Sequence, residues 1–199
     1  MKKIILGIAI IAITAASCNS GSNSTTENKM KTDTAKVDDG MAKDATATNS
    51  TDSKVDGAMK EMVGQYLKIK NGLTTDNGKE AADAANAFVV SMGKMEANSL
   101  TGDKKKAWDK LSDDAKEMAE HIGKNAGKLE HQREHFDMLS KDLYDMVKTF
   151  GAGQPLYKDF CPMYNDNKGA IWLSETKEIK NPYLGTKMPT CGSVKEEIK

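Results

Sequence analysis

The chain lacks an excess of charge of either sign, because its 199 residues carry 29 Lys and Arg against 29 Asp and Glu. It also lacks a basic stripe with interleaved aromatic side chains, which is the usual footprint of a nucleic-acid-binding protein. No GxSxG motif, phosphate-binding loop or HExxH motif occurs. We therefore expect neither nucleic-acid binding nor catalysis.

Long apolar runs are lacking as well, and the one short run lies near the N-terminus. MKKIILGIAIIAITAASC has two lysines, an apolar run over 4–13 and small residues before Cys18. About ten apolar residues are too few to span a bilayer, and this order of regions is typical of an export signal. We predict a signal peptide at 1–18. Its end resembles the lipobox of bacterial lipoproteins, which implies a lipid on Cys18 and a mature chain anchored on the periplasmic side of a bacterial membrane.

Large apolar side chains are nearly absent from residues 19–55, which contain no aromatic residue. Such a segment cannot bury enough apolar surface to offset the entropy lost on ordering. We predict a disordered tether with a root-mean-square reach of roughly 35 Å. It would hold the remaining domain, residues 56–199, close to the membrane.

The domain over 56–199 begins with four stretches in which apolar residues recur at spacings of three and four. This spacing predicts four amphipathic helices, and short polar turns between them favour an all-α, antiparallel up-and-down four-helix bundle. Methionines on the apolar stripes are predicted to fill the core. The apolar positions are Met59, Met62, Val63, Tyr66, Leu67 and Leu73; Ala81, Ala84, Ala85, Phe88, Val89, Met92 and Met95; Trp108, Leu111, Ala115, Met118 and Ile122; and Leu129, Phe136, Leu139, Leu143, Met146, Val147 and Phe150.

After residues 151–153 the helical spacing stops, and an irregular C-terminal tail begins. Residues 156–160 and 170–173 could form a short β-hairpin around the polar turn at 165–169. Irregular segments of this kind usually pack over a scaffold and carry function. We expect the tail to pack over the bundle.

The tail contains two pairs of soft metal ligands, each a cysteine and a methionine with a proline between them. The pairs are Cys161 with Met163, and Met188 with Cys191. His135 should lie near the edge of the apolar stripe of its helix, where it could face the tail. The other two histidines, His121 and His131, are predicted to be solvated helix residues.

Sulfur ligands combined with an imidazole select Cu(I), or zinc when thiolates dominate. The sequence thus suggests a copper site, with zinc as the second choice. Trp172 is expected to pack the tail onto the bundle, where it could also cover the metal. The proposed ligands are His135, Cys161, Met163, Met188 and Cys191.

A disulfide is the competing interpretation of the two tail cysteines. In an oxidising periplasm, Cys161 and Cys191 could bond to each other, which would stabilise the fold by on the order of 3 to 4 kcal/mol. Their spacing in the sequence does not distinguish a disulfide from a metal site.

Three stretches of the sequence resemble a known family: YLKIKNGL at 66–73, QREHFDMLS at 132–140 and PLYKDFCPMYNDNKGAIWLSETKEIKNPYLGTKMPTCGSV at 155–194. The family consists of uncharacterised exported bacterial domains, found alone on lipoproteins and fused to periplasmic adaptor subunits of copper/silver-type heavy-metal efflux pumps. The resemblance covers about residues 55–198. It implies a four-helix up-and-down bundle with the tail folded over it, and a link to copper resistance or homeostasis.

The resemblance favours metal binding over a disulfide. The positions carried over from the matching motifs are His135 in QREHF, Cys161 and Met163 in CPM, and Met188 and Cys191 in MPTCG. We therefore expect a membrane-anchored copper-binding protein that sequesters copper or hands it to an efflux adaptor or another copper protein. The alternative is a structural or protein-interaction lipoprotein whose tail is fastened by a Cys161–Cys191 disulfide.

Overall fold

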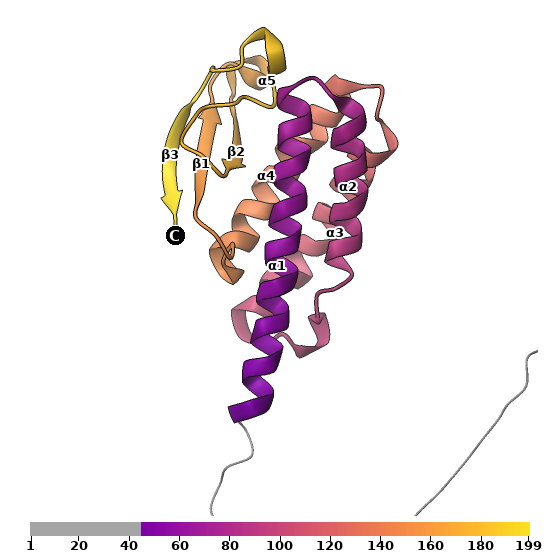
Figure 1. The fold of residues 1–199 in the computed structure, drawn as a ribbon, viewed down its shortest axis with the longest axis vertical. Helices are drawn as coiled ribbons and strands as arrows, with labels where there is room; N and C mark the ends of the chain where they lie inside the picture. Colours follow the sequence, from indigo (N-terminus) through magenta and orange to yellow (C-terminus); the bar gives the residue numbers. More distant parts are fainter. Residues whose placement is uncertain (1–44) are drawn as a thin grey trace, which may run out of the picture. The chain divides into compact units, whose positions relative to one another are not determined.

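Four long helices form a bundle within residues 45–199, the range that this computed structural model describes. Consecutive helices pack on each other, and the fourth also packs on the first (Figure 1). No helix within this range is both long enough and apolar enough to cross a membrane. The predicted signal peptide over 1–18 and most of the predicted tether lie outside the described residues. The helices are α1 (Ala45–Thr74), α2 (Gly78–Met92), α3 (Gly102–Lys124) and α4 (Leu129–Phe150).

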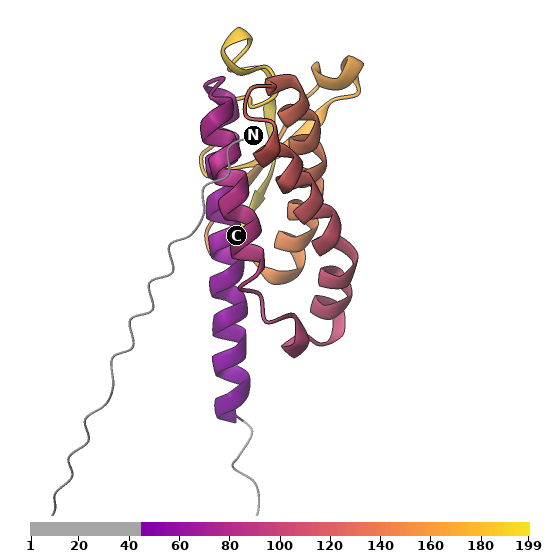
Figure 2. The same cartoon turned by 90° about the vertical axis from the view of Figure 1, so that its right-hand side faces the viewer.

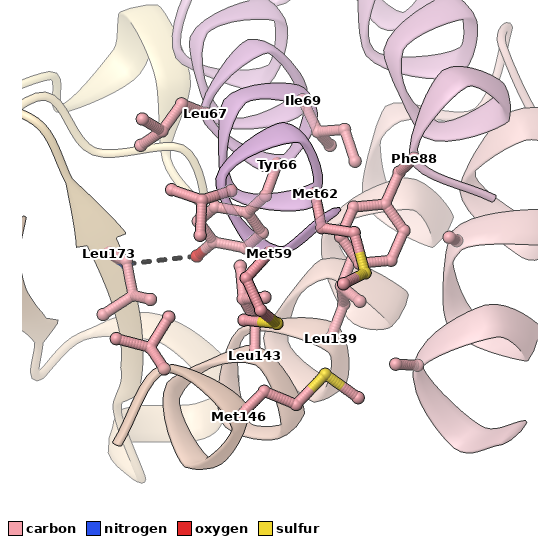
Figure 3. Packing of buried hydrophobic residues seen from close by; sticks show 14 of the residues in the cluster. Met59, Met62, Tyr66, Leu67, Ile69, Phe88, Leu139, Leu143, Met146 and Leu173 are labelled. Carbon is pink, nitrogen blue, oxygen red and sulfur yellow. Dashed lines mark hydrogen bonds between the residues drawn. The ribbon is translucent and has the colours of Figure 1, made fainter. Parts of the chain in front are cut away.

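The predicted apolar stripes of the helices meet in the interior of the bundle (Figure 3). Met59, Met62 and Met146 are fully buried there, which confirms that these methionines fill the core. Tyr66 stacks on Phe136 with 5.0 Å between the ring centroids. Each large apolar side chain buried in this way contributes about 1.5–3 kcal/mol, so the bundle core dominates the stability of the fold.

Helix α1 begins at Ala45, inside the range 19–55 that the sequence assigns to a disordered tether. Figure 2 shows its first turns extending past the ends of the other helices. The last residues of the predicted tether contact the bundle: Val55 is buried, and Lys54 Nζ lies 2.7 Å from Glu96 Oε1. One buried valine and surface ion pairs leave little trace in the apolar pattern, so sequence reasoning placed the boundary too late.

The tail forms a three-stranded antiparallel sheet rather than the predicted short hairpin. Its strands are β1 (Leu156–Cys161), β2 (Ala170–Ser174) and β3 (Ser193–Ile198), in the order β2-β1-β3. The predicted hairpin corresponds to β1 and β2, and its turn contains the short helix α5 (Tyr164–Asn167). The two 3-10 helices are η1 (Ala97–Ser99) and η2 (Gly185–Lys187).

Strand β3 escaped prediction because SVKEEI is charged and mostly exposed. It pairs with β1, with a register shift between Lys158 and Asp159. Glu196 of β3 accepts hydrogen bonds from Tyr144 Oη and Lys148 Nζ of α4, both at 2.7 Å. The strand is thus held by partners that are far away in the sequence. A local pattern of polar and apolar residues does not reveal such partners.

The sheet packs beside α4 and α1 (Figure 1). Tyr66 Oη of α1 lies 2.7 Å from Ser140 Oγ of α4 and accepts a hydrogen bond of 3.1 Å from Leu173 N of β2 (Figure 3). Lys70, which is fully buried, forms an ion pair of 2.6 Å with Glu175. These polar contacts fix the sheet on the bundle, because a buried polar group without a partner costs about 1–3 kcal/mol.

Candidate metal-binding site

The two tail cysteines meet at one end of the sheet. Cys161 is the last residue of β1, and Cys191 lies in the loop that precedes β3. Their Sγ atoms are 3.4 Å apart, and both are free thiols. Cys161 is buried, whereas Cys191 is half-buried. The fold thus brings together two of the five predicted ligands, and the partly open side lies at Cys191.

Asn181, which is fully buried, holds the loop that carries Cys191. Its Nδ2 donates a hydrogen bond of 2.6 Å to the carbonyl of Cys191, and its backbone N–H donates to the carbonyl of Pro189 at 2.8 Å. Its Oδ1 accepts from the backbone N–H groups of Tyr183 and Leu184 at 2.8 and 3.0 Å. One amide side chain therefore fixes Cys191 against the preceding turn.

Arg133 and Asp76 anchor the same tail segment to the bundle. Arg133 Nε donates to the carbonyl of Pro182 at 2.9 Å, and its Nη2 donates to the carbonyl of Leu73 at 3.1 Å and pairs with Asp76. Asp76 also accepts a hydrogen bond from Thr186, which is the main reason that its pKa lies below the ordinary value. Arg133 is 4 % exposed, so this ion pair acts as a buried connection between α4, the end of α1 and the tail.

Trp172 packs next to the thiol pair without touching bulk water. It is fully buried in β2. Gly192, the residue after Cys191, lies so close to the indole that a Cβ on Gly192 would be 2.8 Å from Trp172 Cη2. Gly192 has φ +142°, which side-chain-bearing residues rarely adopt. The ring also meets Tyr183 edge-on, with 6.0 Å between centroids. Trp172 belongs to the buried core that the tail shares with the bundle, and it presses on the residue beside Cys191.

The two tail methionines flank the thiol pair through their backbones. The backbone of Met163 helps to lower the pKa of the Cys191 thiol, and the carbonyl of Met188 accepts from Cys191 N at 3.2 Å. Their side chains are 49 % and 40 % exposed. Two methionines with exposed side chains thus lie within a few residues of the thiols in the sequence.

Burial, followed by the neighbouring Cys161 thiol, raises the pKa of the Cys191 thiol above its ordinary value. The Cys191 thiol is therefore protonated at neutral pH, and a metal that binds to its thiolate must displace that proton. Two thiolates that each lie about 2.3 Å from one tetrahedral ion are about 3.8 Å apart. The observed separation of 3.4 Å is within a small side-chain movement of that distance.

His135 lies on a different face of α4 from the residues that contact the tail. The next residue, Phe136, packs on Tyr183 of the tail with 5.8 Å between ring centroids. His135 instead faces α3, where its Nδ1 is 3.3 Å from Met118 Sδ. Its Nε2 is 3.2 Å from His131 Nε2, and its ring stacks on His121 with 4.3 Å between centroids. The structure thus groups His135 with these three residues.

Burial, with the nearby His121 and His131, lowers the pKa of His135 below its ordinary value. The ring is then neutral at neutral pH, which is the form that binds metal ions. His121 and His131 were predicted to be ordinary solvated residues, and Met118 to be core filling. The signal that could have grouped them is the short turn between α3 and α4, which folds His121 back toward a histidine pair spaced four apart.

The lipid attachment predicted at Cys18 lies outside the described residues.

Asn181 and Arg133, which position the thiol pair, were not singled out from the sequence. Asn181 lies in the stretch NPY and Arg133 in QREHF. A sequence does not show that such a polar residue is buried and holds a loop in place, because that depends on hydrogen-bond partners from distant parts of the chain.

Residues 62–155 match the model of one family, described as Protein of unknown function (DUF3347). The matched range runs from within α1 to just before β1, so it includes the histidines and ends before Cys161. No curated protein and no solved structure matches the chain. A domain of this uncharacterised family is therefore present at residues 62–155.

Proposed function

We propose that the chain is a lipid-anchored periplasmic protein that binds Cu(I) through Cys161 and Cys191. In this proposal Cys18 carries the lipid, and the four helices, as an antiparallel up-and-down bundle, serve as the scaffold. The bound copper is sequestered or passed to a heavy-metal efflux adaptor or another copper protein. The observation that carries the proposal is the approach of the two free thiols to 3.4 Å, although they are thirty residues apart in the sequence.

The ligand types around the pair support copper over a hard cation. Thiolates and thioethers are soft ligands that favour Cu(I), with zinc as the second choice when thiolates dominate. Met163 and Met188, two and three residues from the thiols in the sequence, expose their side chains, and Cys191 is the more accessible thiol. A site with one buried and one accessible sulfur suits an ion that is received from a partner and passed on.

The alternative is a structural or protein-interaction lipoprotein in which Cys161 and Cys191 form a disulfide. The same separation of 3.4 Å favours it, because two-electron oxidation of thiols this close needs little movement. The disulfide would fasten the loop before β3 to the end of β1 and would exclude copper. Neither version includes catalysis.

Anaerobic Cu(I) titration of the full chain, solubilised in detergent and competed against a calibrated chelator, tests the proposal. Thiols are counted on the same sample before and after reduction. We expect one tightly bound copper in the reduced protein and its loss in the Cys161→Ser/Cys191→Ser variant. Met163→Leu and Met188→Leu should weaken binding, whereas Met138→Leu, which changes another exposed methionine, should not.

Unchanged Cu(I) affinity in the double serine variant would refute the copper proposal. A quantitative disulfide in protein recovered from the periplasm, with no chelator competition even after reduction, would establish the structural alternative. The Met138→Leu control separates the contribution of the tail thioethers from a general effect of removing surface sulfur.

A further inference from the structure

We propose that His121, His131 and His135 form a second metal site that binds a divalent transition-metal ion, Zn²⁺ or Cu²⁺, independently of the thiol pair. The site lies on the α3–α4 hairpin. It does not rest on the copper proposal, because it uses none of the tail residues.

The three imidazoles converge on one small volume. Each can offer one ring nitrogen such that all three nitrogens lie within 4.8 Å of one another. The closest approach joins His131 Nε2 and His135 Nε2, at 3.2 Å. Ligand nitrogens at about 2.0–2.1 Å from a tetrahedral zinc ion are about 3.3 Å apart. The His131–His135 pair therefore already has the spacing of two ligands on one ion.

A carboxylate lies near two of the rings, just beyond hydrogen-bond distance. His131 Nδ1 lies 3.6 Å from Glu134 Oε2, which leaves Nε2 free to face His135. His121 Nε2 lies 3.8 Å from Glu117 Oε1, which leaves Nδ1 free. A small side-chain movement would bring either carboxylate into a hydrogen bond, and such a bond fixes the tautomer of a ligating imidazole and increases its basicity.

His121 differs from the other two histidines in its geometry. Its ring stacks on that of His135 with 16° between the planes, so the lone pairs of the two rings lie in nearly parallel planes 4.3 Å apart at the centroids and cannot converge well on one ion. His121 must turn out of the stack to share an ion. Its side chain is 43 % exposed, so it has room to rotate. We therefore assign His131 and His135 as the principal ligands and His121 as the third.

The fourth position is a water molecule, because Met118 lies against Nδ1 of His135 and not against the Nε2 that faces His131. Met118 Sδ is 3.3 Å from His135 Nδ1, so it lies at the edge of the cluster. Imidazole ligands suit zinc and copper, whereas Mg²⁺ and Ca²⁺ prefer oxygen. All three histidines are half-buried, which leaves a path for the ion.

Calorimetric titration of Zn²⁺ into the full Cys18→Ser/Cys161→Ser/Cys191→Ser chain in detergent tests this site without any thiol. We expect one bound ion. Because loss of an outer partner of a metal ligand costs about 10–100-fold in affinity, His131→Ala and His135→Ala should each cost more than about 100-fold and Glu134→Gln about tenfold. His121→Ala should fall between them. The control is Asp113→Ala, which removes an exposed carboxylate from α3, the helix that carries His121. It should leave the Zn²⁺ affinity unchanged.

Co²⁺ provides a measurement that needs no histidine variant. In the thiol-free chain it should give ligand-field absorption without a thiolate charge-transfer band, and Zn²⁺ should displace it. Absence of Zn²⁺ and Co²⁺ binding to the thiol-free chain would overturn the proposal, as would binding that His131→Ala and His135→Ala leave unchanged. Either result leaves the Cu(I) titration of the unmodified chain unaffected, so the two proposals fail separately.

Discussion

The thiol pair and the histidine cluster are built in opposite ways. The thiols come from residues thirty apart in the sequence and meet only because β1 ends beside a loop held by Asn181. The histidines lie within a single helical hairpin, with His131 and His135 one turn apart on α4. A site of the first kind depends on the docking of the tail, whereas one of the second kind depends on two packed helices.

This difference has a consequence for how each site responds to damage. Changes that loosen the tail should reach the thiols and leave the histidines in place. Changes in the hairpin should do the reverse. The variants below test that separation, starting with the largest expected effect.

Trp172→Ala should have the largest effect. The indole is fully buried between the tail and the bundle, and removal of a buried Trp costs about 3–5 kcal/mol. We expect this fall in the free energy of unfolding by urea denaturation, together with weaker Cu(I) binding. Trp108→Ala, which removes a largely buried Trp from α3, should destabilise the protein without weakening Cu(I) binding in the folded fraction. A loss below about 1 kcal/mol in Trp172→Ala would contradict the packing described for the tail.

Asn181→Ala should have an intermediate effect, because it deletes three hydrogen bonds in a buried turn. Each buried group left unpaired costs about 1–3 kcal/mol, and water entry can relieve part of it. We expect a loss of about 2–3 kcal/mol in denaturant unfolding and a lower Cu(I) affinity, with Zn²⁺ binding by the histidines unchanged. Lys187→Ala, an exposed change in the same segment, serves as the control. Equal losses at both metal sites would show that the two regions are not separable.

Asp142→Asn should have the smallest effect, and it depends on pH. Burial, then the nearby Asp114 and Asp145, raises the pKa of Asp142 from 3.8 to about 6. The folded state holds this proton more tightly, so the wild type loses stability as the pH rises from about 4 to about 6. The full shift corresponds to about 3 kcal/mol, which partial exposure reduces to about 1 kcal/mol. We expect Asp142→Asn to be more stable by that amount above pH 6 and equal below about pH 4.

Urea unfolding at several pH values measures this difference. Asp109→Asn, which changes an exposed carboxylate paired with Lys105, is the control for the loss of a carboxylate from the same hairpin. A constant difference between Asp142→Asn and the wild type from about pH 4 to 7 would refute the assignment. Asp142 and Met118 line the same surface hollow on the α3–α4 hairpin. The effect of Asp142→Asn on stability therefore concerns the packing of the hairpin and not that of the tail.

The helices were predictable because their signal is local. Apolar residues at spacings of three and four, such as Met59, Met62 and Val63, lie on one face whatever the rest of the chain does. Strand β3 was not predictable, since its Lys and Glu residues match a solvated segment as well as an edge strand. The start of α1 was missed for a similar reason, because its first described turns add only one buried valine to the core.

The candidate site was predictable only in part. Residue chemistry identified Cys161 and Cys191, and the fold brings them together. The orientation of His135 could not be read from the stripe, because a residue at a stripe edge can face either neighbour. Here it faces α3, and the register of the α3–α4 turn brings His121 to it. That register depends on tertiary packing, which a single sequence does not show.

The hydroxyl of Tyr66 also affects how the sheet could associate with other chains. β2 is an edge strand, and edge strands offer unpaired N–H groups onto which another strand can add. At Leu173 that N–H is already bound to the phenol of α1. Addition of a strand along β2 would have to break this contact. The opposite edge, β3, presents Lys195, Glu196 and Glu197, so self-association through either edge of the sheet is disfavoured.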